Sequence, residues 1–297
     1  MQQAASAAAG AQHYPAGALY VVATPIGNLA DITLRAVHVL GLVDAIACED
    51  TRHSAPLLRQ LGIEGKALIS VHQHNEREAA DGVLARLARG ERVAYVSDAG
   101  TPAVSDPGAA LVAAAQSAGY RVLPIPGASS AVAALSVAGD AIVGPFTFIG
   151  FLPTRASDRT HAVGALAAAP QAQILFEAPH RIETLAAALA QACPNRTLTV
   201  CRELTKQFET VASMPAGEMP AWLAADANRS RGEFVLVVHA LATADAPGDR
   251  APYESTLVTL LAALPLKQAV ALTAELSGAP RNAVYERALA LKNAAAD

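Results

Sequence analysis

The stretch LYVVATPIGNLAD, residues 19–31, decides the fold, because the pattern that it sets recurs along most of the chain. Leu19–Ala23 is a short apolar run typical of a buried strand, and a loop containing Pro, Gly and Asn follows it. Asp31 or Thr33 can then cap a helix that carries its apolar residues on one side. A strand, a loop rich in Pro, Gly and Asn, and a helix in this order predict an α/β fold.

The same alternation continues through the first half of the chain, with further strands expected at Ala45–Cys48, Leu68–Val71, Val93–Ser97 and Val122–Ile125. Strands separated by helices predict a mainly parallel sheet, and ligands bind such sheets at the carboxyl ends of the strands. Three loops fall at that edge, Thr24–Leu29, Asp98–Gly108 and Pro126–Ser130. All three are rich in residues that let a ligand approach the main chain.

The second half repeats the alternation and predicts a second α/β domain, with strands at Phe146–Phe151, Gln173–Phe176, Leu198–Cys201 and Phe234–His239. We therefore expect an unstructured tail over residues 1–16, an N-terminal α/β domain over 17–144 and a C-terminal α/β domain over 145–242. Thr243–Arg250 is expected to link these domains to a helical tail domain over 252–297. The helices and Gly/Pro turn of this tail outline a helix-turn-helix unit, although a simple packing hairpin fits the pattern as well.

Composition narrows the classes of function. The 297 residues carry a net charge of −4, and the pI is about 6.1. This balance argues against broad electrostatic binding of nucleic acid, but it leaves room for a local basic patch and a folded target. Three cysteines without a CxxC pair predict neither a zinc ribbon nor a disulfide framework. Without a signal peptide or a bilayer-spanning run, the chain is expected to be cytoplasmic.

Several familiar sites are absent from the sequence. There is no GxGxxG after the first strand, no Walker A loop, no HExxH and no GxSxG. His72 and His74 lack an acidic or cysteine cluster nearby, so we predict no metal site. Asp98 and Asp106 invite the interpretation of a paired-carboxylate hydrolase, but Gly100, Thr101 and Pro102 between them suit backbone contact better than acid–base work.

Two charged segments directly follow apolar strands, EAPHR at residues 177–181 and RELTK at residues 202–206. One interpretation is an ion-pair network that orders a domain interface. The other is a polar cluster at the mouth of a cleft, because catalytic residues often lie in the loops at strand ends. The sequence pattern alone leaves both open.

Eight motifs in a fixed order resemble the tetrapyrrole methylase superfamily, over about residues 18–292. Four of them, TPIGNLADITLRA, EDTR, SDAGTPAVSDPG and PGASSAVAAL, resemble its S-adenosylmethionine (SAM)-binding half. GFLP, APHR, RELTK and LPLKQA…SGAPRNAVYERAL narrow the resemblance to members that methylate the ribose 2′-hydroxyl of a cytidine in the decoding region of 16S rRNA. The resemblance implies SAM in a cleft between two α/β domains, a homodimer, and rRNA of the small ribosomal subunit as partner.

The resemblance also implies the site residues. SAM contacts are expected at Pro25, Asp98, Gly100, Thr101, Pro102, Val104, Ser105, Asp106, Pro126, Gly127, Ser129 and Ser130. A ribose hydroxyl is a poor nucleophile, so we expect a proton acceptor or a cation among Glu177, Glu203, His180 and a Lys206 neutralised by burial. RNA contacts are expected at Arg52, His74, Arg155, Arg159, Arg181 and Arg202, with Lys267, Arg281, Arg287 and Lys292 as a second set in the tail.

The main alternative is a SAM-dependent methyltransferase of a small molecule such as a porphyrinoid. Such an enzyme would share the SAM loops, so those loops cannot separate the two functions. The segment Gly100-Thr101-Pro102 stands where the porphyrinoid-modifying relatives have a GDP-type loop, and the RELTK segment and basic tail favour RNA.

Overall fold

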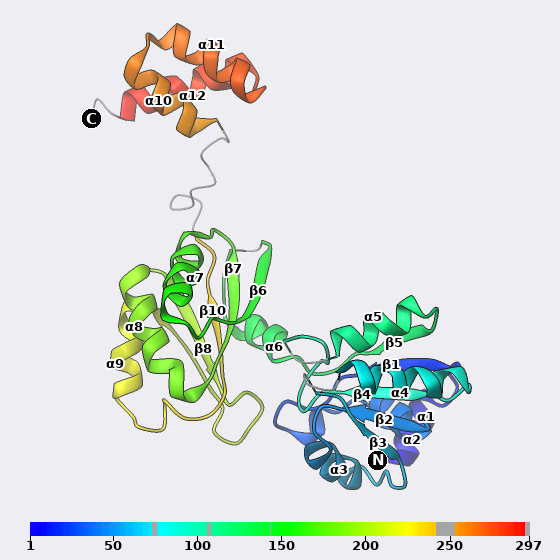
Figure 1. The fold of residues 1–297 in the computed structure, drawn as a ribbon. Coiled ribbons are helices and arrows are strands. Elements are labelled where there is room, and N and C mark those ends of the chain that lie inside the picture. The colour runs from blue at the N-terminus through cyan, green and yellow to red at the C-terminus, as the bar shows by residue number, and fades with distance from the viewer. Residues whose placement is uncertain (73–75, 106–107, 143, 242–252, 295–297) are drawn as a thin grey trace.

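The computed structural model describes residues 1–297 except 73–75, 106–107, 143, 242–252 and 295–297. Within these ranges the chain forms two β-sheets, each covered by helices, and a separate group of three C-terminal helices (Figure 1). The predicted α/β class and the division into two α/β halves and a helical tail are confirmed. Among the described residues, no helix is both long and apolar enough to cross a membrane.

The first sheet is parallel throughout, in the order β3-β2-β4-β1-β5. Its strands are β1 Ala18–Val22, β2 Ala45–Cys48, β3 Ala67–Ser70, β4 Val93–Val96 and β5 Arg121–Ile125. The helices that alternate with them are α2 Leu34–Leu42, α3 Thr51–Gln60, α4 Glu76–Ala88, α5 Ala109–Ser117 and α6 Ser130–Val137, and a 3₁₀ turn, Leu29–Asp31, precedes α2. Alternate residues of β1, β2 and β4 enter two apolar clusters on opposite faces, which explains why these strands are apolar at every position.

The second sheet is mixed, in the order β6-β7-β10-β8-β9, and in this it differs from a simple repeat of the first. Its strands are β6 Phe146–Phe151, β7 Ala172–Glu177, β8 Thr197–Arg202, β9 Thr210–Pro215 and β10 Phe234–Val238. Only β6 and β7 pair in parallel; β10 is antiparallel to β7 and β8, and β8 is antiparallel to β9. The accompanying helices are α7 Ala156–Ala168, α8 Ile182–Ala192 and α9 Met219–Ala224, with 3₁₀ turns at Pro179–Arg181 and Ala216–Glu218.

Helix α6 joins the two halves. It follows β5 of the first sheet in the chain, yet its small residues Ala131 and Ala134, and Ala138 at its C-cap, pack with residues of the second sheet, among them Ile174 and Val237. The opposite face of that sheet packs in a cluster with α7, α8 and α9. The second sheet therefore lies between its own helices and a helix contributed by the first half.

The first residues of the chain are helical. The prediction of an unstructured tail over residues 1–16 was therefore wrong for Gln2–Ala9. Helix α1, Gln2–Ala9, turns Ala5 and Ala9 inward, and Ala5 belongs to the apolar cluster that also holds residues of α2. Tyr14 is buried and its hydroxyl donates a hydrogen bond to the Ala9 carbonyl at 3.1 Å. The alanines at positions i and i+4 are thus the buried side of a short helix.

The C-terminal helices are α10 Glu254–Ala263, α11 Leu266–Ser277 and α12 Arg281–Ala294. They pack around a small apolar cluster of their own that contains Leu257, Val270, Val284 and Ala288. Gly278 ends α11 in the left-handed conformation (φ +68°), which a glycine adopts without strain. The expected linker Thr243–Arg250 lies outside the described residues.

Replacing Ala5 by Glu tests the packing of α1. The new carboxylate would have to enter the cluster against α2, so we expect the free energy of unfolding to fall by roughly 1–3 kcal/mol. Urea titration followed by circular dichroism measures the change. The matched control is Ala4→Glu on the exposed side of the same helix. Equal stability of the two variants would contradict the docking of α1.

Candidate functional site

A cavity of about 500 Å³ lies between the two halves of the molecule. The first half lines it with residues that follow β1, β2, β4 and β5, so it opens at the carboxyl ends of those strands, where the sequence predicted a ligand. The lining residues of this half are Ile26, Glu49, Ser97, Asp98, Ala99, Val104, Ser105 and Ser130. The second half contributes an apolar wall from Phe151, Phe176, Cys201 and Leu204, and the residues Glu177–Pro179 and Glu233–Val235.

The three predicted ligand loops are tied to one another. The Thr24 and Gly100 backbones exchange two hydrogen bonds, with N···O distances of 2.9 and 3.1 Å. Thr101 donates from Oγ1 to the Ala128 carbonyl at 3.0 Å, which connects the second loop to the third. Gly100 and Ser105 both have positive φ values, +81° and +65°, so this loop is tightly turned. The loop conformation is therefore set by contacts among the loops themselves.

The expected SAM contacts divide into two groups. Asp98, Val104, Ser105 and Ser130 line the cavity, and Pro25 lines a second cavity that adjoins it. The others lie in the same loops but outside the lining of both cavities: Gly100, Thr101, Pro102, Pro126, Gly127 and Ser129. Asp106 lies outside the described residues.

Glu177 is held in a buried ion-pair network. Its Oε2 lies 3.1 Å from Arg159 Nη2, and its Oε1 lies 3.1 Å from Arg181 Nε and accepts the Ala178 amide at 2.9 Å. The carboxylate is fully buried, and the two arginine side chains are only 12% and 16% exposed. Arg181 also donates to the Leu152 carbonyl at 2.7 Å. For the EAPHR segment the structure thus favours the ion-pair interpretation, and Arg159 and Arg181 are used inside the protein rather than presented to RNA.

Lys206 is paired with two carboxylates, because its Nζ lies 2.8 Å from Glu203 Oε1 and 3.1 Å from Glu233 Oε2. Burial alone would lower the pKa of Lys206, but the hydrogen bonds to Glu203 and Glu233 outweigh it and raise the pKa. Burial would raise the pKa of Glu203, yet the hydrogen bonds from Lys206 and the Glu233 amide lower it. Lys206 is therefore an ammonium ion, contrary to the neutral base considered from the sequence.

The remaining predicted residues are scattered. Arg52 binds its neighbour Asp50, and Arg202 donates to the Phe208 carbonyl at 3.0 Å, which holds the loop between β8 and β9. Arg155 is exposed before α7, and His180 is exposed and lines neither of the two cavities. His74 lies outside the described residues.

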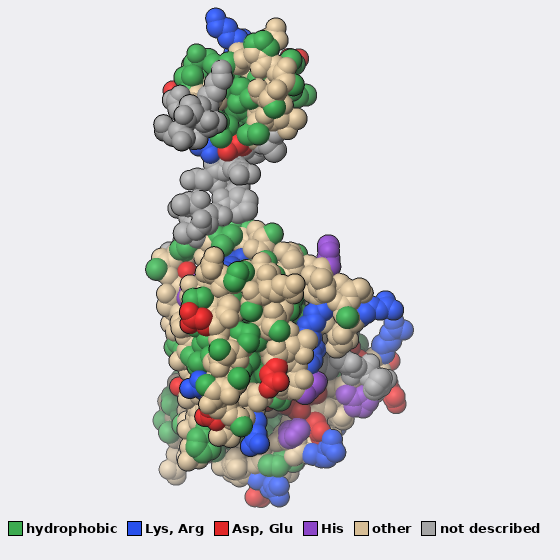
Figure 2. Space-filling view, turned by 90° about the vertical axis from the view of Figure 1, so that its left-hand side faces the viewer, with side chains coloured by type: hydrophobic (Ala, Val, Ile, Leu, Met, Phe, Trp, Pro, Cys, Tyr) green, Lys and Arg blue, Asp and Glu red, His purple; other side chains and the backbone are tan. Residues whose placement is uncertain are grey.

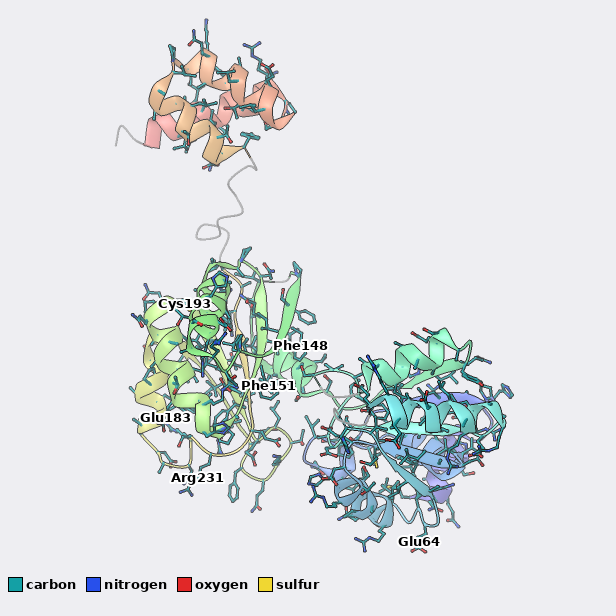
Figure 3. The ribbon with its side chains drawn as sticks, in the orientation of Figure 1. Glu64, Phe148, Phe151, Glu183, Cys193 and Arg231 are labelled. Carbon is teal, nitrogen blue, oxygen red and sulfur yellow. The ribbon has the colours of Figure 1, made fainter. Side chains whose placement is uncertain are left out.

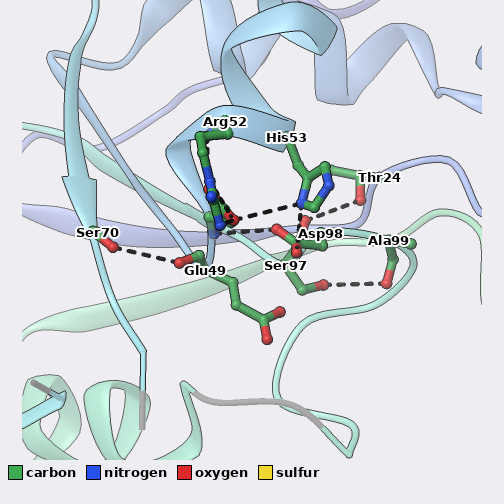
Figure 4. A network of polar contacts seen from close by, with 9 residues as sticks. Thr24, Glu49, Arg52, His53, Ser70, Ser97, Asp98 and Ala99 are labelled. Atoms are coloured by element: carbon green, nitrogen blue, oxygen red, sulfur yellow. Dashed lines mark hydrogen bonds and ion pairs between the residues drawn. The ribbon is translucent and has the colours of Figure 1, made fainter. Parts of the chain in front are cut away.

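The structure adds residues that the sequence analysis missed, above all Glu49, which directly follows β2, and His53, in the first turn of α3. His53 Nδ1 lies 2.9 Å from Asp98 Oδ2 (Figure 4), although the two residues are 45 positions apart. Burial, and then the charge of Asp98, raise the pKa of Glu49. The sequence feature that could have identified both residues was the EDTR motif at 49–52, which follows β2. Because β2 and β4 are neighbours in the sheet, the segments that follow them come into contact.

The lining of the first cavity fits SAM. A volume of about 500 Å³ is within the range of cofactor pockets. Phe151 and Phe176 offer apolar ring surface, Ser105 and Ser130 offer hydroxyls, and the Asp98 carboxylate suits a positively charged ligand. Burial raises the pKa of Cys201 to about 11, so this lining thiol stays protonated. In the described part of the chain, no three His, Cys, Asp or Glu residues are grouped to hold a metal ion.

Comparison of the sequence with known proteins gives near full-length matches. Residues 18–220 match the Tetrapyrrole (Corrin/Porphyrin) Methylases, and residues 247–292 match the RsmI C-terminal HTH domain. Proteins named Ribosomal RNA small subunit methyltransferase I are similar to this chain. That of Neisseria meningitidis serogroup B is 48% identical, over 93% of this chain and 94% of the relative. That of Pseudomonas aeruginosa is 47% identical, over 92% and 97%.

Solved structures share the fold at much lower sequence identity. A cobalt precorrin-4 methyltransferase of cobalamin biosynthesis aligns with a TM-score of 0.57 at 18% identity, covering 76% of this chain and 98% of that one. A uroporphyrin-III C-methyltransferase from Thermus thermophilus, solved with S-adenosyl homocysteine, aligns with a TM-score of 0.52 at 15% identity, covering 74% and 97%. Both matches support the architecture of the two sheets.

Replacing Glu177 by Gln tests whether this residue is structural. The change would leave two mostly buried guanidinium groups without their counter-charge, so we expect a loss of about 3 kcal/mol or more in unfolding free energy. Guanidinium or heat unfolding measures it. Glu183→Gln, at an exposed position on α8 (Figure 3), is the control and should leave stability unchanged. A stable E177Q protein that has lost only its activity would instead support a catalytic carboxylate.

Proposed function

Because this chain belongs to the tetrapyrrole methylase family, and within it to the proteins named ribosomal RNA small subunit methyltransferase I, we propose that it methylates the ribose 2′-hydroxyl of a cytidine in 16S rRNA, using SAM. The near full-length sequence similarity carries this proposal. The cavity between the two sheets supports it, because that cavity has the size and lining that SAM needs. Because the proposed substrate is ribosomal, we expect the activity to be cytoplasmic.

The residues that would hold SAM are those that line the first cavity. Ser105 and Ser130 offer hydrogen bonds, Phe151 and Phe176 offer apolar contact, and Asp98 lies on the side shared with the second cavity. SAM supplies a methyl group on a positively charged sulfur. The protein orients the reactants and excludes water, and correct positioning alone can contribute roughly 7–11 kcal/mol to lowering the barrier.

The charge distribution supports a folded RNA target rather than a long stretch of bare RNA. The chain is negative overall, but Figure 2 shows Lys, Arg and His side chains gathered on one side of the two-sheet body, with carboxylates among them. Arg52 and Arg155 are exposed and remain proposed RNA contacts. A nucleotide that is splayed out of its stack would then reach the cleft.

The C-terminal helices offer a second RNA contact. Lys267, Arg281, Asn282 and Tyr285 line a hollow of about 150 Å³ on α11 and α12. This combination suits a phosphate next to a base, because the cations bind the phosphate and the ring can stack on the base. Arg287 does not line this hollow, and its guanidinium makes two hydrogen bonds to Glu254, at 2.7 and 3.0 Å.

A homodimer is also proposed. Large apolar side chains remain exposed on α6 and on the edge strand β6: Val132 and Phe146 are 58% and 48% exposed, and Val137 and Ile149 are exposed as well. An open edge strand and an apolar helix side are surfaces that proteins usually cover. A second copy of the chain is the partner that the family resemblance indicates.

The activity is tested with methyl-labelled SAM and small ribosomal subunits from cells that lack the endogenous methylation. We expect label in a single 2′-O-methylcytidine. Ser130→Trp should weaken SAM binding about tenfold or more by filling the cavity, and Ser117→Trp, exposed at the end of α5, should not. Protein that binds SAM but labels no RNA would contradict the rRNA function and favour a small-molecule substrate.

The dimer is tested by sedimentation equilibrium of Val132→Asp and Phe146→Asp. Each change places a charge in the proposed interface, so we expect the mass to fall from that of two chains to that of one. Leu276→Asp, at an exposed apolar position of α11, is the control and should remain dimeric. A parent protein that is monomeric at micromolar concentration would contradict the proposal.

A further inference from the structure

A second cavity, of about 310 Å³, adjoins the first. The two share Ile26, the segment Ser97–Ala99 and Glu233 as lining, so Asp98 lies on the wall common to both. The second cavity also has residues that the first lacks, notably His53 of α3 and Lys206. If SAM occupies the first cavity, as the proposed function requires, then the second is next to it and open to a group that approaches from solvent.

The His53 ring is oriented by a carboxylate. Asp98 Oδ2 lies 2.9 Å from Nδ1, while Asp98 Oδ1 accepts the Asp50 amide at 3.1 Å, so both carboxylate oxygens are engaged (Figure 4). A carboxylate only accepts hydrogen bonds, so Nδ1 carries a hydrogen, and in the neutral imidazole the lone pair is then on Nε2. The His53 side chain is 66% exposed, and a substrate can therefore reach it.

Asp50 does not replace Asp98 as the partner of the His53 ring, because the Asp50 carboxylate is bound by Arg52. Side-chain and backbone hydrogen bonds from Arg52 lower the pKa of Asp50 to about 2. Its Oδ2 lies 2.6 Å from Arg52 Nη2 but 3.9 Å from His53 Nδ1. The shorter and better-formed contact of His53 is the one with Asp98.

The other candidates for proton acceptor are less suited. Glu177 is occupied by two guanidinium groups and an amide, Lys206 is an ammonium ion, and His180 lines neither cavity. Glu49 lines the first cavity but not the second, so it is on the cofactor side. Among these residues, His53 alone combines a lone pair, that of Nε2 in its neutral form, with a place on the wall of the second cavity.

We infer that the second cavity receives the target ribose and that His53, held by Asp98, is the catalytic base that accepts the proton of the 2′-hydroxyl. This inference rests on the proposed function. As the bond between the ribose oxygen and the methyl carbon forms, the hydroxyl proton passes to His53 Nε2. The electron pair of the broken carbon–sulfur bond remains on sulfur, which becomes a neutral thioether, and the imidazolium later loses its proton to solvent.

The test measures single-turnover methyl transfer to small subunits at saturating SAM, for the parent, His53→Ala and His53→Gln. General-base catalysis contributes about 10²–10⁴-fold, so we expect both variants to lose about 100-fold or more in rate. Their affinities for SAM and for small subunits, measured separately, should stay within about threefold of the parent. Added imidazole should restore part of the rate of H53A, where the side chain leaves space, but not of H53Q.

His161→Ala is the matched control, because this histidine is exposed on α7 and lines neither cavity. Its rate should equal that of the parent. Asp98→Asn should also slow the reaction, and imidazole should not rescue it, because an amide that donates to Nδ1 forces the hydrogen onto Nε2.

Three results would overturn the inference, and they have different consequences for the proposed function. An active parent with an H53A rate within tenfold of it would exclude His53 as the base while leaving the proposed function intact. The same holds if weaker subunit binding accounts for the whole loss. A parent that labels no RNA would refute the proposed function, and the role of His53 with it.

Discussion

The site depends on one packing contact, that of the alanine-rich side of α6 against the second sheet. Ala131, Ala134 and Ala138 lie in one apolar cluster with Ile174 and Val237, and Thr199 donates from Oγ1 to the Ala138 carbonyl at 3.0 Å. The small side chains bring the helix close to the strands. Because α6 begins directly after the third ligand loop, this contact fixes the loop relative to the second half and so fixes the cavity.

Charge has two separate uses around that cavity. The Arg159–Glu177–Arg181 network is buried and joins α7, β7 and the turn after it, so its main effect is to hold the second half in shape. The pairs on the other side, His53 with Asp98 and Lys206 with Glu203 and Glu233, are partly exposed and border the second cavity. Groups that must meet a substrate remain accessible, whereas groups that maintain the fold are covered.

The sequence predicted the first sheet well because β1, β2 and β4 are buried on both faces, which leaves an uninterrupted apolar run in each. It missed β9, an edge strand in which exposed residues alternate with half-buried ones and with the buried Met214, so that the apolar signal is weak. It also missed α1, because a run of alanines has high helix propensity but little apolar contrast between its faces. The loops were located correctly, since topology alone brings the ends of β1, β4 and β5 together.

Individual roles were harder to predict, because they depend on partners distant in sequence. Glu177 pairs with Arg159, 18 residues away. The sequence around Arg159 gives no sign that its guanidinium is used in this ion pair. The protonation of Lys206 depends on Glu233, which the sequence analysis did not consider. His53 was passed over because its partner follows a different strand.

A crystal structure of the chain with S-adenosylhomocysteine tests the account most directly, because every step depends on where the cofactor binds. The account predicts density for the ligand in the cavity lined by Ser105, Ser130 and Phe176, with its sulfur toward Asp98 and the cavity of His53. Ligand bound elsewhere, or bound with its sulfur turned away from Asp98, would contradict both the assignment of the cleft and the mechanism built on it.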